Sequence, residues 1–565
     1  MKLPYGLSDF KKLRTGDYLY IDKTNYIKKL EEISSDYLFF IRPRRFGKSL
    51  FLSTLKYYYD LNHQDKFEQL FGNLYIANNK TKLKNSYFIL ELNFSGLNTD
   101  TKDKLEESFR AKLRAGIIEA IEKYQDYFEK PQEIIKDINR VDDIGAILQF
   151  FISAVKKTDK KVYLIVDEYD HFANHIIAMG NEKFYKEIIR ATGFVRDFYE
   201  TVKIGTESVI DQIFITGISP IMLDDLTSGF NISTNLTMNP IVNQMLGFTE
   251  REVEGIIEQL DVEAKKQELM KVLRENYNGY LFNQQCEERV YNPDMVLYFF
   301  NQWQMTGDYP QNLIDDNVKT DYGRLDRLVT NQDNRKILEQ IIQQEGITSD
   351  IITKFSFDRM YDQEYFVSLL FYMGLLTIKG TRYGKIRLGI PNYVTKTIFW
   401  EYFERKLKEE YNIKYNTEEL AKSIWEMGFD GEIKPFLEYI SSQVLKQLSN
   451  RDLLNFDEKY IKVILFSYLI TSNLYHPISE REVENGYIDI YLEKDIRMPD
   501  LNYEWILELK YLKKSDKDQL DAVKVEGLKQ LQNYAVSRNM EDKENVKQAL
   551  IIFVGKDEYV IEKND

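Results

Sequence analysis

The sequence predicts an α/β chain with an α/β domain at each end and a helical middle. Three observations lead to this fold class. Three short apolar runs in the first 220 residues are separated by helical patterns, which is typical of a parallel sheet with flanking helices. Helix-type periodicity then dominates, and strands and helices alternate again near the C-terminus. We expect three domains, at residues 1–248, 249–412 and 413–565.

Composition bounds the class of protein. Apolar residues make up 43% of the chain and aromatic residues alone 14% of it, which is ample for packed cores. The single cysteine, Cys286, excludes an internal disulfide framework. The start of the chain lacks a signal segment and no apolar run nears the ~18 residues that span a membrane, so we expect a cytoplasmic protein without a membrane partner. A net charge of −14 argues against a protein that coats nucleic acid over much of its surface.

The first functional pattern follows the apolar strand that begins at Tyr37. There the chain runs through RPRRFGKSLFLSTL into a helix, with Gly47, Lys48 and Ser49 at the helix start. A helix N-terminus presents unpaired N–H groups and a positive dipole end, which favour phosphate. As in a Walker A loop, Lys48 would reach the β and γ phosphates and the Ser49 hydroxyl would ligate Mg²⁺. Arg42 departs from the GxxxxGK[ST] signature, because it stands where that signature has glycine.

Two further apolar strands end in polar side chains that suit a nucleotide. Residues 162–168 (VYLIVDE) end in Asp167, expected to hold Mg²⁺, and Glu168, expected to orient or deprotonate the attacking water. Residues 213–219 (IFITGIS) carry Thr216, placed to sense the γ-phosphate. Ligand sites of open α/β sheets lie at the carboxyl ends of the strands. The alternative is three unrelated core strands with polar ends.

The arginines of the loop have two interpretations. Arg42, Arg44 and Arg45 could clamp phosphates bidentately, or one could act as an arginine finger on a neighbouring subunit. Alternatively, they balance nearby acids. The nucleotide-binding residues we predict are Arg42, Pro43, Arg44, Arg45, Phe46, Gly47, Lys48, Ser49, Asp167 and Thr216.

The middle of the chain is predicted to be helical with one hairpin. GFTEREVEGIIEQL opens with a capping pattern, Thr-x-x-Glu, and LTIKGTRYGKIRLGIPN reads as two strands around Gly384. Helices followed by such a hairpin resemble a winged helix. These modules bind DNA or serve as packing spacers, and the few basic residues at 364–375 favour the spacer. The charged run 405–419 marks a boundary.

Near the C-terminus, residues 487–493 and 503–512 read as an antiparallel hairpin around KDIRMPDLN. If the hairpin is symmetric about its loop, Asp489 lies across from Glu508, with Cβ atoms ~4.5–5.5 Å apart. Lys510 follows Glu508 on the same face, because strand side chains repeat every second residue. All three side chains should therefore converge.

Two close carboxylates call for a hard divalent cation, and oxygen ligands favour Mg²⁺ or Mn²⁺. The ion would activate water and clamp phosphate oxygens, while Lys510 would hold the developing hydroxide or the phosphate. The pattern thus predicts a metal-dependent phosphodiesterase. The alternative is an exposed salt-bridge hairpin of little energetic value, but the apolar residues that flank Glu508 favour a central strand.

These residues resemble the PD-(D/E)xK nuclease superfamily, whose core is a helix, a hairpin carrying D and ExK, a second helix and a further strand. Here 458–470, 518–537 and 549–554 suit the helices and the last strand. The resemblance implies a restriction-endonuclease-like α/β domain with Gln530 beside the site. The literal Pro499–Asp500 falls in the hairpin loop and is interpreted as a decoy.

Several segments together resemble a bacterial AAA-ATPase-like family that carries a C-terminal PD-(D/E)xK domain. They include PYGLSDFKKLRTGDYLYIDKTNYI, RPRRFGKSLFLSTL, LIVDEYDHFAN, FITGISPI, NYNGYLFN and ERVYNP. RPRRFGKS is that family's own form of the loop. The resemblance implies an N-terminal P-loop NTPase fold that binds ATP with Mg²⁺.

The combined expectation is an ATP-binding and ATP-hydrolysing switch coupled to a Mg²⁺- or Mn²⁺-dependent nuclease. Its catalytic residues would be Asp489, Glu508, Lys510 and Gln530 for cleavage and Glu168 for ATP hydrolysis. The expected partners are ATP and a nucleic acid, DNA in the first instance. In one alternative the chain is a regulatory NTPase whose nuclease-like domain binds nucleic acid or protein without cleavage. In another, the phosphate loop binds nothing and its domain is a scaffold.

Overall fold

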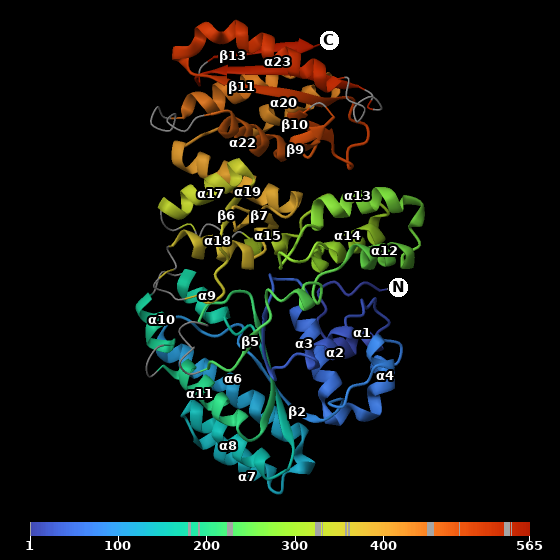
Figure 1. The fold of residues 1–565 in the computed structure, drawn as a ribbon, viewed down its shortest axis with the longest axis vertical. Coiled ribbons are helices and arrows are strands. Elements are labelled where there is room, and N and C mark those ends of the chain that lie inside the picture. The colour runs from blue at the N-terminus through green and yellow to red at the C-terminus, as the bar shows by residue number, and fades with distance from the viewer. Residues whose placement is uncertain are drawn as a thin grey trace. The chain divides into compact units, whose positions relative to one another are not determined.

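A computed structural model of the chain forms two compact units (Figure 1). The first unit comprises residues 1–337 and 346–394, and the second comprises 338–345 and 395–565. The prediction had three domains, whereas in the structure most of the predicted middle segment shares a unit with the N-terminal sheet. Among the described residues, no helix has both the length and the apolarity needed to cross a membrane. The structure describes residues 2–178, 182–189, 193–222, 230–322, 329, 332–355, 359, 362–448, 457–484, 486–535, 543, 545–556 and 558–564.

The first unit is built on a parallel five-stranded sheet. Its order is β2 (Tyr87–Asn93), β3 (Lys161–Asp167), β4 (Ile210–Gly217), β1 (Tyr37–Ile41) and β5 (Thr234–Asn235). The strands β1, β3 and β4 are buried almost throughout, as near-continuous apolar runs in parallel sheets are. The α/β fold with a parallel sheet is therefore confirmed, and the strands predicted at 162–168 and 213–219 are β3 and β4.

Helices cover both faces of this sheet (Figure 1). One side carries α1 (Phe10–Thr15), α2 (Asn25–Glu31), α3 (Lys48–Tyr59), α4 (Phe67–Phe71) and α5 (Tyr75–Asn78). The other carries α6 (Lys102–Lys123), α7 (Pro131–Arg140), α8 (Ile144–Lys156) and α11 (Phe194–Thr206). The helices α9 (His171–Ala178) and α10 (Glu182–Ile189) follow β3. Because β1 leads directly into α3, the loop between them lies at the carboxyl edge of the sheet.

The rest of the first unit is mainly helical. It contains α12 (Glu250–Gln259), α13 (Lys266–Tyr277), α14 (Pro293–Thr306) and α15 (Asp316–Tyr322), and α17 (Gln332–Gln344) continues into the second unit. A small antiparallel sheet has the order β6 (Gly346–Ser349), β8 (Lys385–Gly389), β7 (Thr377–Arg382), with α18 (Gln363–Tyr372) between β6 and β7. The predicted helix-then-hairpin order is present, and β6 adds a strand that the sequence did not reveal.

The second unit holds a mixed five-stranded sheet between helices (Figure 1). Its order is β13 (Glu558–Asn564), β12 (Val546–Val554), β11 (Glu504–Leu512), β10 (Gly486–Lys494) and β9 (Tyr475–Val483), with only β11 and β12 parallel. The helix α23 (Leu520–Ala535) lies on one side of the sheet, and α20 (Thr417–Phe429) and α22 (Glu458–Leu469) lie on the other. The unit also contains α19 (Tyr393–Tyr411), which enters it from the first unit, and α21 (Lys434–Tyr439).

Candidate nucleotide and nuclease sites

The loop between β1 and α3 has the backbone of a phosphate-binding loop. Gly47 immediately precedes α3 with φ of 89°, a left-handed conformation that glycine adopts without strain. Lys48 is the first residue of the helix, and its Nζ donates to the carbonyl oxygens of Arg42 and Pro43, both at 2.9 Å. Burial lowers the pKa of Lys48 to about 8. An ammonium group held by carbonyls in this way is available to exchange those partners for phosphate oxygens.

Ser49 and Asp167 form the second part of this site. The Ser49 hydroxyl donates to Oδ2 of Asp167 at 2.7 Å, which joins the start of α3 to the end of β3. Burial raises the pKa of Asp167. Glu168 follows in a left-handed conformation, with φ of 50°, and lines the cavity beside the loop. A hydroxyl and a carboxylate in contact are oxygen ligands of the kind that Mg²⁺ uses beside nucleotide phosphates.

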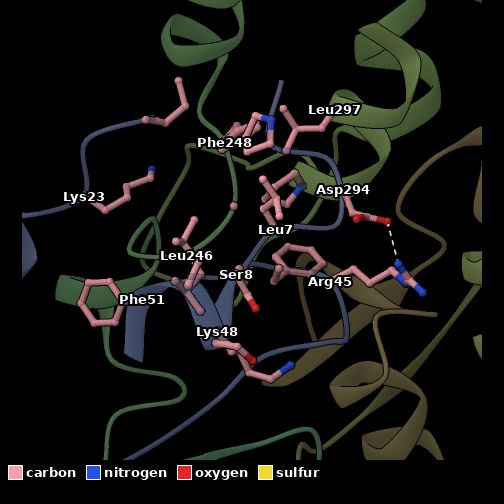
Figure 2. A pocket seen from close by; sticks show the side chains of 18 of the residues that line it. Leu7, Ser8, Lys23, Arg45, Lys48, Phe51, Leu246, Phe248, Asp294 and Leu297 are labelled. Carbon is pink, nitrogen blue, oxygen red and sulfur yellow. Dashed lines mark hydrogen bonds and ion pairs between the residues drawn. The ribbon is translucent and has the colours of Figure 1, made fainter. Parts of the chain in front are cut away.

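A cavity of about 460 Å³ opens next to the loop, and several parts of the chain line it besides Glu168 and His171 after β3 (Figure 2). Its walls combine the phosphate loop, the N-terminal segments 4–8 and 19–23, and residues from 245 to 297. Such a volume is typical of a small-molecule site. The apolar residues labelled in Figure 2, Leu7, Phe51, Leu246, Phe248 and Leu297, surround the polar loop.

Two ion pairs connect this cavity to helices that lie beyond residue 248. Arg45 pairs with Asp294 in the first turn of α14 at 3.1 Å (Figure 2). Lys23 pairs with Glu252 of α12 at 2.8 Å. Our sequence reasoning missed Asp294 and Glu252 as neighbours of the loop. The available signal for Asp294 was Asn292–Pro293 directly before it, since a capping Asn followed by Pro is typical of a helix start.

The structure contradicts the predicted role of Arg42 as a phosphate clamp. Arg42 is only 1% exposed, and its Nη atoms donate to the backbone carbonyls of Ile41, Thr237 and Val242 at 2.7–3.1 Å. The guanidinium carbon also lies over the rings of Phe40 and Phe282, 4.3 and 4.0 Å from their centroids. The guanidinium of Arg42 is therefore held by backbone carbonyls and aromatic rings inside the unit, and Arg42 does not line the cavity.

Thr216 is likewise turned away from the loop cavity. Its hydroxyl donates to the Phe40 carbonyl at 2.6 Å and the residue is 1% exposed, so it ties β4 to β1 and does not face a γ-phosphate here. Phe46 is buried and packs edge-on against Tyr280 and Phe282, which anchors the loop while part of the residue lines the cavity. Arg44 lines the cavity, and its contact with phosphate stays a prediction.

The second site lies on the central hairpin of the C-terminal sheet. The register of β10 and β11 pairs Ile490 with Leu507, and one further step places Asp489 opposite Glu508. Lys510 Nζ lies 2.6 Å from Oε1 of Glu508 and 3.8 Å from Oδ2 of Asp489. Oδ2 of Asp489 also accepts the backbone N–H of Leu509 at 3.0 Å. The three side chains therefore converge as the symmetric hairpin predicts.

The carboxylate of Glu508 is under electrostatic strain. It is 1% exposed, and its Oε2 accepts no short hydrogen bond among the described residues. The nearby Tyr534 hydroxyl, which donates to the Tyr487 carbonyl at 2.7 Å, opposes the rise in the Glu508 pKa only weakly. Burial, together with the negative charge of Asp489, raises the pKa of Glu508 to about 7, against the opposing effect of Lys510. A buried carboxylate oxygen without a short hydrogen bond is the kind of group that a cation stabilises.

Two acidic residues beside this site were missed in the sequence. Glu458, in the first turn of α22, has its pKa raised by burial and by Asp489. Glu480 lies across from Asp489 on β9, between the pairs Ile488–Arg481 and Ile490–Ser479, with φ of 51°. It forms an ion pair with the buried Lys462. Sequence spacing could not identify either residue. Glu480 lies on β9, which was not predicted, and nothing in the sequence indicates that the first turn of α22, with Glu458, lies beside Asp489.

Gln530 lies on α23, and no partner among the described residues reaches its side-chain oxygen, which is buried. Asp500 is exposed in the turn between β10 and β11, where the decoy interpretation places it. Over the described ranges, no three or more His, Cys, Asp or Glu residues are grouped to hold a metal ion. Mg²⁺ commonly takes one or two carboxylates and completes its shell with water and phosphate oxygens, so the Asp489–Glu508 pair fits such an ion.

Comparison with known families gives a match at each end of the chain. Residues 4–227 match the family model described as a predicted AAA-ATPase, and residues 456–563 match the model of the PD-(D/E)XK nuclease superfamily. The chain therefore carries an N-terminal AAA-ATPase-like domain and a C-terminal domain of the PD-(D/E)XK nuclease superfamily, in the predicted arrangement.

Individual relatives are more distant. An uncharacterized protein in the vnfD 5′ region of Azotobacter chroococcum mcd 1 is 26% identical over 478 residues, which covers 82% of this chain and 81% of that protein. The Walker-type ATPase paby2304 of Pyrococcus abyssi is 12% identical, covering 67% of this chain and 96% of that one, with a TM-score of 0.41. The Aeropyrum pernix ORC1 protein in complex with DNA is 10% identical, covering 70% and 98%, with a TM-score of 0.29. Neither structural likeness is close enough to carry an argument.

Proposed function

We propose that the chain is an ATP-binding and ATP-hydrolysing switch coupled to a Mg²⁺- or Mn²⁺-dependent nuclease. The observation that carries the nuclease half is the convergence of Asp489, Glu508 and Lys510, with one buried Glu508 oxygen that accepts no short hydrogen bond from the described residues. A salt bridge with Lys510 accounts for the interaction of Oε1 of Glu508, but among the described residues it provides no short hydrogen bond to Oε2.

In this proposal, Asp489 and Glu508 hold the cation. When bound, the cation would lower the pKa of water and neutralise charge on the scissile phosphate. Lys510 has two tasks in turn. Its ammonium first favours the ionised form of Glu508, and once the carboxylates hold the ion it would donate to a phosphate oxygen or to the attacking hydroxide.

At the ATPase site, Lys48 would exchange the Arg42 and Pro43 carbonyls for β- and γ-phosphate oxygens. Ser49 and Asp167 would hold Mg²⁺, and Glu168 would orient the attacking water. Of the three loop arginines, only Arg44 and Arg45 would contact the nucleotide phosphates, because Arg42 is buried.

The test is a cleavage panel of single- and double-stranded DNA and RNA with Mg²⁺, Mn²⁺ or a chelator. We expect metal-dependent cutting by the native protein and its loss in Asp489→Ala. The matched control is Asp500→Ala, which removes a carboxylate from the exposed turn of the same hairpin and should leave cutting unchanged. Equal cutting by native protein and Asp489→Ala would refute the assignment of the site.

A second candidate is a regulatory NTPase whose nuclease-like domain binds nucleic acid without cleaving it. It is favoured by the lack of a third metal ligand among the described residues and by the 2.6 Å pairing that already neutralises part of the Glu508 charge. Binding without cleavage across the whole panel would support it.

A further inference from the structure

We propose that the β7–β8 hairpin of the first unit is a nucleic-acid-binding surface. In this inference Arg382, Lys385 and Arg387 contact backbone phosphates, and Tyr383 stacks on a base. The surface is separate from the carboxylates of the second unit, and the inference does not depend on whether those residues cleave anything.

The first argument is charge. Residues 377–389 contain four basic side chains, those of Lys379, Arg382, Lys385 and Arg387, and no acidic one. All four residues are exposed. In a chain whose acidic residues outnumber its basic ones by 90 to 76, so dense a positive segment is a local departure that suits a polyanion.

The second argument is the strand register. Arg382 pairs directly with Lys385 across the turn, and like charges in that position repel each other. Arg387 lies two residues beyond Lys385 and therefore shares its face of the sheet. Acids at the edge relieve only part of this repulsion, because the contacts of Lys385 to Asp350 and Glu364 are 3.5 and 3.7 Å long and exposed. A phosphate backbone would relieve the rest.

The third argument is the tip of the hairpin. Tyr383 and Gly384 form a two-residue turn with φ of 52° and 78°, a geometry in which Asn, Asp and Gly are the usual residues. Tyr383 is 91% exposed, and the guanidinium of Arg382 lies 5.2 Å from its ring centroid. An aromatic ring presented beside cations offers both stacking and charge to a nucleic-acid strand.

The neighbouring helix does not compete for this role. In α18, every residue from Tyr365 to Tyr372 is buried, so the helix belongs to the core and cannot enter a groove. The packing role predicted for this segment therefore applies to α18. The basic side chains and Tyr383 that would contact nucleic acid lie on the β7–β8 hairpin.

The experiment measures fluorescence anisotropy of labelled single- and double-stranded oligonucleotides with the full chain, in a chelator so that cleavage cannot interfere. The test variant is Arg382→Gln/Lys385→Gln/Arg387→Gln. The matched control is Lys156→Gln/Lys157→Gln/Lys160→Gln, which removes the same charge from exposed positions elsewhere in the first unit. Thermal unfolding checks that both variants are folded.

We expect the hairpin variant to lose affinity on the order of ten-fold or more at low salt, and the slope of log affinity against log salt to fall by about two to three. The control should change neither quantity appreciably. Tyr383→Ala should weaken single-strand binding by about five-fold or more with the salt slope retained, because stacking releases no counterions.

The inference is overturned if the hairpin variant loses no more affinity than the control. It is also overturned if the native protein does not bind nucleic acid but binds anionic phospholipid vesicles, and the hairpin variant loses that vesicle binding. Loss of cleavage in Asp489→Ala leaves the outcome unaffected, so failure of the nuclease proposal and failure of this one can be told apart.

Discussion

At the scale of single residues, the phosphate loop shows why its three arginines are not equivalent. Arg42 donates to three backbone carbonyls and lies between two aromatic rings, whereas Arg44 lines the cavity and Arg45 pairs with Asp294. Sequence alone could not separate them, because two of the three carbonyl partners of Arg42, Thr237 and Val242, lie about 200 positions away in the chain. The side chain that departs from the loop signature is thus explained by packing.

We predict that Arg42→Met lowers the free energy of unfolding by ~2–4 kcal/mol, because the buried carbonyls of Ile41 and Thr237 lose their side-chain donor and that of Val242 keeps only the Met245 N–H. The folded fraction should bind ATP with near-native affinity. Arg44→Met is the comparison, with native stability and weakened ATP binding. Denaturant unfolding and calorimetry measure both quantities, and a stable Arg42→Met protein that no longer binds ATP would restore the clamp hypothesis.

Glu508 gives a prediction of pH dependence. Its pKa rises from 4.5 to about 7 on folding, so the folded state disfavours the ionised form. The resulting destabilisation is absent below pH 4.5, grows as the pH rises and is complete above pH 7. The rise in pKa already includes the opposing effect of Lys510, and a shift of this size is worth at most about 3 kcal/mol.

Glu508→Gln should therefore raise stability at pH 8 and leave it nearly unchanged at pH 4, when both proteins are unfolded in a chelator. Added Mn²⁺ should stabilise the native protein and not the variant, since only the native protein has both carboxylates. A variant that is less stable than the native protein at pH 8 in chelator would show that the ion pair with Lys510 outweighs burial.

At the scale of elements, the start of α12 links a helix cap to the nucleotide cavity. Thr249 and Glu252 form a capping box, and Glu252 also pairs with Lys23, whose side chain is 12% exposed. Thr249→Ala removes one cap hydrogen bond and should lower the free energy of unfolding by ~1 kcal/mol. Glu252→Ala should cost about 2–3 kcal/mol, because it also leaves a buried ammonium group without its carboxylate.

Combining Lys23→Met with Glu252→Ala tests that reason. If the unpaired ammonium group causes the larger effect, the double variant recovers part of the stability that Glu252→Ala loses. Equal losses in Thr249→Ala and Glu252→Ala, with no recovery in the double variant, would mean that only the cap matters. Denaturant unfolding of the four proteins supplies the comparison.

The elements also show which parts of the fold are readable from sequence. Strands β1, β3, β4 and β11 were predicted because each is a dense apolar run that is buried almost throughout, and β10 was predicted from the alternation of Ile488, Ile490 and Leu492 with other residues. The edge strands β9 and β5 were missed, because β9 contains Pro477 and alternates with exposed residues, and β5 has only two residues, both exposed. Glu480 was missed together with β9, so the acidic surroundings of Asp489 could not be foreseen although the pair with Glu508 could.

At the scale of the whole molecule, the limit of prediction was long-range assembly. The cavity brings Ser8, Lys48 and Asp294 to one place, and residues 338–345 belong to a different unit from the segments on either side of them. Hydrophobic periodicity records the local direction of burial and carries no information about which distant segment supplies the partner. The motif residues of each site could therefore be named in advance, whereas the walls of the cavity could not.

The coupling of the two sites is the prediction that belongs to the whole chain. Lys48→Ala removes the ammonium group that the proposal assigns to the β and γ phosphates, so ATP affinity measured by calorimetry should fall by at least ~10-fold. Lys48 lies in the first unit and Asp489 in the second, so the substitution leaves the carboxylates of the nuclease site intact.

If nucleotide occupancy controls cleavage, ATP should change the metal-dependent cleavage rate of the native protein and have no effect on that of Lys48→Ala. Lys56→Ala, a change of the same residue type on the same helix outside the loop cavity, should respond to ATP as the native protein does. If Lys48→Ala no longer binds nucleotide in calorimetry but its cleavage rate still responds to ATP, nucleotide binding at the Lys48 site does not control cleavage.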